Sequence, residues 1–391
     1  MRWAWLALVV LALAGRAAAW EVDLGGDARY YQFLRVGEDG GDRRDSELGI
    51  FRLKLQGRLR DEWSVDVQGV VSLTSPRSAG VSAIATGATR RLFDLDATLV
   101  RGGDAEVVAE LDRLSLTWQR RTFRLVAGRQ AITWGVNYFW PVLDLFAPFP
   151  PERIDREYKP GVDALRLTVP LGALSEVEVV AAGQGTSLED DASVGALARV
   201  HLGPADVGAM AGRFHRDLVL GGFVTANVRG TGVRVEVAYT DSGDPADAVI
   251  GRSSFWRASA GVDRQLTPTL TLSAEAGWNG FGSDDPADYP RIAAADRVQR
   301  GEVNSLGRSY IGASLVWQAH PLVSVTGVVL VNLSDASVLF LPHVDWSLAD
   351  NLSLVAGALI GIGPGLNPDK TPGSEYGTVP ATVYTALRAY F

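Results

Sequence analysis

The sequence predicts an all-β fold: a single transmembrane, antiparallel, up-and-down β-barrel of about 18 strands. Three observations lead to this fold class: the alternation of apolar and polar residues along most of the chain, connections that are alternately short and long, and a final residue, Phe391, that closes an alternating run. An even number of strands would place both ends of the chain on one side of the membrane. Because strand boundaries read from a sequence are uncertain by about two to four residues, a barrel of about 16 strands is kept as an alternative.

The chain begins with a segment that predicts export. Residues 1–19 read as a secretory signal peptide, with a basic Arg2, an apolar stretch over residues 3–14 and the small-residue cleavage pattern of Ala17–Ala19. Residues 20–391 would then form the mature barrel. Beyond the signal peptide, no run reaches the roughly 18–20 uninterrupted apolar residues of a membrane helix. An exported chain without such a helix is either soluble or a membrane β-barrel, and the strand pattern decides between the two.

The composition excludes several classes of protein. Hydrophobic residues make up 47% of the chain and charged residues 21%, which excludes a disordered chain. The sequence has no cysteine, which excludes a disulfide scaffold, a thiol nucleophile and a thiolate metal site. The net charge of −8 argues against nucleic acid as a partner. The sequence indicates neither a metal nor a cofactor.

Alternation with a period of two residues defines the strands. In residues 51–60, Phe51 and Leu53 alternate with Arg52 and Lys54, which is typical of a strand with one apolar and one polar face. A tight turn and a second alternating run over 63–71 complete a β-hairpin. The same unit recurs, and single strands near 22–34 and 381–391 stand at the ends. The other predicted hairpins join 114–118 to 123–127, 165–169 to 176–179, 196–201 to 207–212, 220–228 to 233–237, 256–263 to 270–275, 311–317 to 323–331 and 338–346 to 352–360.

The connections support a membrane barrel. Turns inside the hairpins are short and most links between hairpins are longer, which is the pattern of outer-membrane barrels with short periplasmic turns and longer extracellular loops. A soluble β-sandwich also alternates, but open sheets rarely exceed about ten strands without splitting. Two links, 75–107 and 282–306, look like partly disordered surface loops. The predicted links are 35–46, 75–107, 135–160, 185–191, 214–218, 242–252, 282–306, 332–336 and 363–380.

Aromatic residues and the last strand indicate the outer membrane of a Gram-negative bacterium. Several tryptophans lie near predicted strand ends, where amphipathic rings prefer the level of the lipid headgroups. They are Trp63, Trp118, Trp256, Trp278, Trp317 and Trp346. Val383, Leu387 and Phe391 occupy alternate positions at the end of the chain, and such an ending resembles the signal read by the barrel assembly machinery. The expected surroundings are therefore outer-membrane lipid and lipopolysaccharide, with the assembly machinery as a partner during biogenesis.

A stretch of about 40 residues resembles a known family. It consists of Gly128-Arg129-Gln130-Ala131-Ile132-Thr133-Trp134-Gly135, then Phe139, Pro141, Asp144 and Pro148, and finally Glu157-Tyr158-Lys159-Pro160-Gly161-Val162-Asp163. This stretch is similar to one found in alginate-export-type barrels and in related barrels of unassigned function. The rest of the chain resembles the porin class in pattern. The resemblance implies a passive outer-membrane channel, with or without substrate selectivity, and does not identify the substrate.

The inward faces of the predicted strands carry many charges. A barrel of about 16–18 strands leaves an aqueous channel, so these side chains would set selectivity through a transverse electric field. The alternative is that they pair across strands and only keep a wet interior ordered. The like charges of Arg52, Lys54 and Arg58 at every second position favour a functional role, because they repel one another. The predicted lumen set is Arg52, Lys54, Arg58, Asp66, Arg124, Arg129, Arg166, Glu176, Glu178, Arg199, Arg234, Glu236, Arg257, Asp263, Glu275 and Asp345.

The link 135–160 is the predicted constriction of the lumen. It is rich in proline and aromatic residues, and such an apolar loop would not stay free in water. It would either fold into the lumen or pack on the rim of the barrel, and we favour the lumen. The predicted constriction residues are Trp140, Asp144, Phe146, Glu152, Arg153, Asp155, Arg156, Glu157 and Lys159.

We therefore expect a channel for the passive diffusion of small polar or charged solutes, and not an enzyme. The sequence contains no G-x-S-x-G, G-x-G-x-x-G, phosphate-binding-loop or H-E-x-x-H motif. The alternative is a structural barrel that acts as a sleeve or export conduit for a periplasmic partner, such as a multihaem cytochrome. Because the chain has no C-x-x-C-H motif, any haem would belong to that partner.

Overall fold

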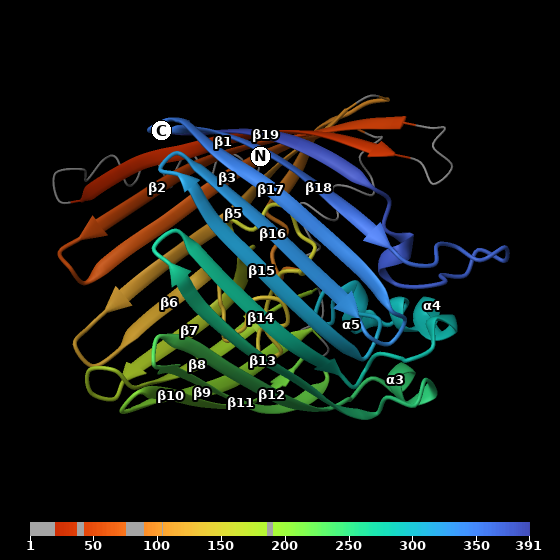
Figure 1. Ribbon diagram of the computed structural model, residues 1–391. Helices are drawn as coiled ribbons and strands as arrows, with labels where there is room; N and C mark the ends of the chain where they lie inside the picture. Colours follow the sequence, from red (N-terminus) through yellow and green to blue (C-terminus); the bar gives the residue numbers. More distant parts are fainter. Residues whose placement is uncertain (1–19, 37–42, 76–89, 104, 186–190) are drawn as a thin grey trace.

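The computed structural model describes residues 20–36, 43–75, 90–103, 105–185 and 191–391. The predicted signal peptide lies outside the described residues and stays a prediction. Within the described chain, the strands form one closed antiparallel barrel (Figure 1). The first and last strands, β1 and β19, pair with each other over Asp27–Arg35 and Thr382–Tyr390, which closes the barrel.

Eighteen strands build the wall of the barrel, as the sequence predicts. They are β1 (Glu21–Val36), β2 (Arg43–Leu59), β3 (Trp63–Thr74), β5 (Glu106–Gln119), β6 (Arg124–Gln130), β7 (Val162–Pro170), β8 (Glu176–Gly183), β9 (Ala192–Leu202), β10 (Ala205–Phe214), β11 (Asp217–Val228), β12 (Thr231–Asp241), β13 (Ser254–Thr267), β14 (Leu270–Asn279), β15 (Ser309–His320), β16 (Val323–Asn332), β17 (Ser337–Ala349), β18 (Leu352–Ile362) and β19 (Thr382–Tyr390). All eight predicted hairpins are confirmed by the strand pairing, and the alternative of 16 strands is wrong.

One further strand was not predicted. β4 (Asp96–Arg101) lies within the link 75–107 and pairs with residues 106–110 of β5. On the other side of β5, the same residues pair with β3. β4 therefore continues the wall beyond the end of β6, which is only 7 residues long.

The outer face shows the predicted apolar and aromatic surface. Trp256 and Trp278 are exposed at the end of the barrel that carries the long links, and Trp317 and Trp346 are exposed at the end with the short turns. In β19, Val383, Thr385 and Leu387 are exposed, whereas Tyr384 and Ala386 between them are buried and face inward. The alternation at the end of the chain is confirmed, and the assembly signal at Phe391 stays a prediction.

The links at the long-link end differ from the prediction in two ways. Links 214–218 and 332–336 are tight turns, since β11 begins at Asp217 and β17 at Ser337. The link 282–306 is wholly described and packed, so its prediction as a partly disordered surface loop is wrong. It carries η3 (Pro286–Asp288), α4 (Tyr289–Ala293) and α5 (Asp296–Gln299), and α3 (Pro245–Val249) lies at the same end (Figure 1). No helix among the described residues is long and apolar enough to cross a membrane.

Buried charge explains why the link 282–306 is ordered. Glu302 accepts an ion-pair contact from Arg297 at 3.1 Å and from Arg257 at 3.4 Å, and it also binds Arg300. Although burial alone would raise it, these three guanidiniums hold the pKa of Glu302 well below its ordinary value. Removing the link from this position would leave the buried Arg257 of β13 without its ion-pair partner.

The link between β6 and β7 lies inside the barrel. We call residues 131–161 the lumen loop; they form neither helix nor strand. Figure 1 shows this irregular segment in yellow, enclosed by the strands. Its side chains join two apolar clusters with inward-facing wall residues, so the loop is packed in the interior and not on the rim.

Candidate functional site: the lumen and the loop inside it

The lumen loop leaves and re-enters the wall at a buried ion pair. The Arg129 guanidinium donates from Nε to Asp163 Oδ1 at 2.8 Å and from Nη2 to Oδ2 at 2.9 Å. It also donates to the carbonyl of Leu111 at 2.8 Å, and Arg129 is only 1% exposed. Such a bidentate pair fixes both position and orientation.

Arg129 does not face the lumen, so its prediction as a lumen residue is wrong. Asp163, its partner in the β6–β7 register, lies on the same face of β7 as Leu165, which is 50% exposed on the outer side. Arg129 is tolerated on this face because Phe93 covers it and accepts a hydrogen bond through its carbonyl. The pair therefore closes the wall at the point where β6 and β7 stop.

Other residues of the family-like stretch hold the two ends of the lumen loop together. Lys159 donates from Nζ to the Thr133 hydroxyl at 2.9 Å and to the buried carboxylate of Asp144. The Gly161 N–H donates to Asp112 Oδ1 at 3.1 Å. The stretch that resembles alginate-export-type barrels thus forms the base of the inserted loop.

Glu236, on β12, accepts three backbone hydrogen bonds from the lumen loop. The N–H groups of Val136 and Asn137 donate to Oε1, the latter at 2.6 Å, and the N–H of Leu143 donates to Oε2 at 3.0 Å. The Glu236 side chain is 0% exposed. A buried carboxylate is well matched to several N–H donors, because each one stabilises its charge.

Glu275, on β14, repeats this arrangement one strand pair further along. It accepts from the N–H groups of Tyr138 at 2.9 Å, Phe139 at 3.2 Å and Trp140 at 2.7 Å. Between the two carboxylates, Asn137 donates from Nδ2 to Ser259 Oγ on β13 at 2.7 Å. Five consecutive loop residues, 136–140, are therefore held by three neighbouring strands.

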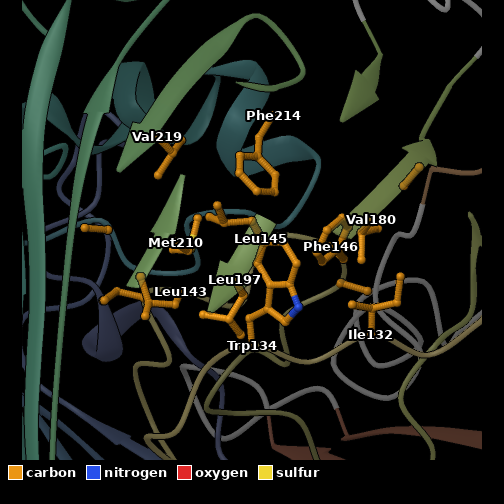
Figure 2. Packing of buried hydrophobic residues seen from close by; sticks show 14 of the residues in the cluster. Ile132, Trp134, Leu143, Leu145, Phe146, Val180, Leu197, Met210, Phe214 and Val219 are labelled. Atoms are coloured by element: carbon orange, nitrogen blue, oxygen red, sulfur yellow. The ribbon is translucent and has the colours of Figure 1, made fainter. Parts of the chain in front are cut away.

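The apolar side of the lumen loop fills the space along β8–β12. Figure 2 shows loop residues Trp134, Leu143 and Phe146 meeting Leu197 and Phe214 of the wall. The Trp134 ring lies edge-on to Phe146, with centroids 5.0 Å apart, and its Nε1–H donates to Glu178. This half of the lumen is packed like a protein core.

Glycines in the wall make room for this packing. A Cβ atom at Gly221, on β11, would lie 2.5 Å from Leu143 Cδ2, and one at Gly312, on β15, would lie 2.7 Å from Phe139 Cδ2. Both distances are below van der Waals contact, so a larger residue at either position would displace the loop.

The opposite half of the lumen carries charges. The Tyr158 ring of the lumen loop is surrounded by Arg29, Arg52 and Lys54, whose charged groups lie 5.0, 4.2 and 4.4 Å from its centroid. Arg29 and Arg52 are buried in ion pairs, with Asp155 at 2.5 Å and Asp112 at 2.8 Å respectively. Lys54 is the accessible cation of the three, with its side chain 27% exposed. Lys54 also lies 3.5 Å from Asp27, so each of the three cations has a neighbouring acid.

A cavity of about 380 Å³ lies along β1–β7, towards the short turns. Within the described residues, Arg58 and Arg124 line it without a carboxylate partner. Glu21, Asp23 and Asp66 line it from β1 and β3. Acids and Arg58 thus line the cavity together from β1–β3, and the lining from β5–β7 carries arginines and no acid.

The space on the other side of the lumen loop is much smaller. Two gaps of about 40 and 50 Å³ separate loop residues 139–153 from residues 300–305 of the packed link. A gap of that size holds a few water molecules. Of these three spaces, the largest therefore lies on the charged side.

Most of the other predicted lumen residues face inward and form ion pairs. This agrees with the alternative that inward charges pair across strands and keep the interior ordered. The pairs are Arg166–Glu178, Arg199–Glu176 at 3.4 Å, Arg234–Asp263, and Asp345 with Arg388 at 3.5 Å. Arg257 also faces inward but is covered by Glu302 of the packed link. The open part of the lumen is lined by only part of the predicted set.

The predicted constriction residues divide into buried and exposed groups. Trp140, Phe146 and Asp144 are buried, and Arg153 donates to the carbonyl of Asp155 at 2.6 Å. The exposed residues are Arg156 and Glu157, and Glu152 is partly exposed.

The sequence reasoning missed several residues of the site. Tyr138 is 49% exposed and lies under the Arg234 guanidinium, 4.1 Å from its centroid, while its carbonyl accepts a hydrogen bond from Arg156 at 2.8 Å. Arg29 and Tyr158 were also missed. Arg29 lies on the inward face of β1, so strand alternation could have identified it. No group of three His, Asp or Glu side chains in the described residues could hold a metal ion.

No protein-family model and no curated protein matches the chain. Solved structures match its fold. OccAB1 of Acinetobacter baumannii is 11% identical, with a TM-score of 0.60 over 95% of this chain and 96% of that one. OccAB2 of the same organism is 10% identical, with a TM-score of 0.57 over 95% of this chain and 98% of that one. OccK3 (OpdO) of Pseudomonas aeruginosa is 11% identical, with a TM-score of 0.56 and 95% of both chains covered.

At these identities the likeness concerns the fold. The chain has the fold of a porin-like outer-membrane barrel, which confirms the porin-like resemblance at that level. The similarity of Gly128–Gly135 to alginate-export-type barrels stays a prediction.

Proposed function

We propose that the protein is an outer-membrane channel for the passive diffusion of small polar or charged solutes, with both termini in the periplasm and no enzymatic activity. The observation that carries this proposal is the lumen loop, which lies across the interior of a closed barrel and leaves a charged cavity of about 380 Å³ beside it. A barrel of this size with an inserted loop is the arrangement of a narrowed pore. The outer surface would contact lipid and lipopolysaccharide.

The charges that line the cavity would act on the solute. Arg124 on β6 and Asp66 on β3 line the same cavity from different strands. A solute that passes between them experiences a transverse field, which favours dipolar and charged molecules over apolar ones. The sleeve for a periplasmic partner has less support, because the barrel's own loop already fills much of the lumen.

Single-channel recording in a planar bilayer tests this function. The refolded protein should give current steps of stable size, and deletion of residues 142–156 should raise the conductance several-fold. Arg124→Ala should shift the reversal potential in a salt gradient towards cation preference, and Asp66→Ala should shift it the other way. A folded, inserted barrel that stays silent would contradict the proposal and favour a sleeve.

A further inference from the structure

Two carboxylates of the wall, Glu236 and Glu275, take six of the backbone N–H groups of the lumen loop. We propose that they are positioning residues, which hold the loop against the β11–β15 side and thereby keep the cavity along β1–β7 open. The proposal rests on the proposed channel function for its consequence, but the position of the loop can be measured without any current.

The lumen loop needs such acceptors because it has no regular secondary structure. In a helix or sheet, backbone N–H groups find carbonyl partners within the element, whereas buried N–H groups of an irregular segment must find them elsewhere. Residues 136–140 provide five consecutive N–H donors, and Glu236 and Glu275 accept all of them. Charge-assisted hydrogen bonds of this kind are stronger than those between neutral groups.

The geometry gives each carboxylate a separate role. Glu275 accepts hydrogen bonds from three consecutive residues, 138–140. Two of them, Phe139 and Trp140, pack in an apolar cluster with Tyr310. Glu236 binds Leu143, which is fully buried among wall residues of the other apolar cluster. The two carboxylates therefore fix the loop at the junction of its two apolar contacts.

Charged neighbours do not replace these hydrogen bonds. The nearest cation on the wall, Arg234 on β12, is bound to Asp263 and packs on Tyr138. Arg156 of the loop donates to the Tyr138 carbonyl. Among the described residues, neither arginine forms an ion pair with Glu236 or Glu275, so the backbone of the loop is the principal partner of both carboxylates.

Thiol labelling of the full-length, folded barrel tests the position of the loop. The chain has no cysteine, so Leu143→Cys introduces a single thiol at a fully buried site. In this background, a bulky maleimide should react slowly. Adding Glu236→Gln or Glu275→Gln should raise the labelling rate about tenfold or more, because the amide turns an NH₂ group towards N–H donors and leaves them unsatisfied.

Glu176→Gln is the matched control. It removes one inward carboxylate, which pairs with Arg199 at 3.4 Å and has no contact with the loop. Its labelling rate should equal that of the Leu143→Cys parent. If the amide variants do not fold, Glu275→Asp tests the same contact, since it keeps the charge but shortens the side chain, and it should also speed labelling.

A covalent rescue separates loop position from loss of charge. Asn137 and Ser259 are in direct side-chain contact, so Asn137→Cys with Ser259→Cys offers a cross-link between loop and wall. In the Glu236→Gln, Glu275→Gln barrel, the open-channel current should be noisy, and it should become quiet on oxidation and noisy again on reduction.

Two results would overturn the proposal: labelling at position 143 that does not change in the folded amide variants, or current noise that the cross-link leaves unaltered. A wild-type barrel without current would contradict the channel function alone, because the labelling experiment would still report where the loop lies.

Discussion

The two halves of the lumen are built by different means. Along β8–β15, apolar loop residues pack on the wall and backbone N–H groups bind Glu236 and Glu275. Along β1–β7, the inner face carries arginines and carboxylates, and Tyr158 is the loop's aromatic contact there. The first half resembles a protein core, whereas the second holds buried ion pairs beside a polar cavity. One closed sheet can therefore hold the lumen loop fixed on one side and leave a cavity on the other.

Two inward carboxylates illustrate two kinds of partner. Asp112 binds the guanidinium of Arg52, whereas Glu236 binds the backbone of the loop. Asp112 balances a positive charge of the wall. Glu236 accepts hydrogen bonds from backbone N–H groups that, in a helix or strand, would bind backbone carbonyls. The stability of the β8–β15 half should therefore depend on the burial of apolar side chains, and that of the β1–β7 half on ion pairing.

The largest expected effect concerns the point where the two halves meet. Arg129→Ala leaves Asp163 buried without its partner, so it should lower the free energy of unfolding by about 3–5 kcal/mol. Urea-induced unfolding from lipid vesicles measures this. Arg101→Ala is the control, because the Arg101 side chain is 75% exposed in its pair with Glu106 and should cost at most about 1 kcal/mol. Equal losses for the two variants would show that the buried pair does not close the wall.

The wall was predictable because its signal is local. Strand alternation needs only neighbouring residues, and it identified every hairpin of the barrel. It also placed Glu236 correctly on an inward face, between the exposed Val235 and Val237. β4 was missed because Thr98-Leu99-Val100 does not alternate.

The roles of the inward residues could not be predicted in the same way. Glu236 and Arg124 both read as inward charges, but the partners of Glu236 are N–H groups about a hundred positions earlier in the chain. Arg129 follows Gly128, whose positive φ marks the end of β6, and the segment that covers it is distant in sequence. Such contacts depend on the tertiary fold, so the sequence identified the set of candidates and not their division between the two halves.

The second expected effect tests the packed half. Leu143→Ala removes a fully buried side chain of the lumen loop and should lower the free energy of unfolding by about 2–5 kcal/mol. The loop should also become sensitive to added protease. Leu366→Ala, at an exposed position, should change the stability by less than about 0.5 kcal/mol. If Leu143→Ala were as mild as its control, the packed half would not behave as a core.

A smaller effect is expected in the charged half. Tyr158→Leu removes the ring that lies against Arg52 and Lys54, and it should cost about 0.5–2 kcal/mol. Tyr158→Phe keeps the ring and loses only the hydroxyl that accepts from Lys54, so its loss should be smaller. Unfolding in urea measures both variants, and a loss above that of Leu143→Ala would reverse the proposed division of the lumen.

The smallest effect concerns the long-link end, where Glu375 connects several segments. It accepts hydrogen bonds from the Leu306 N–H at 2.9 Å, the Tyr310 hydroxyl at 2.6 Å and Asn332 Nδ2 at 2.7 Å. Asn332 Nδ2 also lies 3.0 Å from Asp335, so two carboxylates share one amide. Burial, with the negative charges of Glu152 and Asp335, raises the pKa of Glu375 to about 7.

A raised pKa in the folded state means that folding favours the protonated acid. This stabilisation should be fully present below the ordinary pKa of a glutamate and should be lost as the pH rises through about 7. Hydrogen exchange of residues 300–307 should therefore slow as the pH falls from about 8 to 5, after correction for the intrinsic rate. Glu375→Gln mimics the neutral form and should remove this dependence, while strands β9 and β10, which carry none of the groups that act on Glu375, should exchange alike in both proteins. A pH dependence that survives the substitution would assign it to another group.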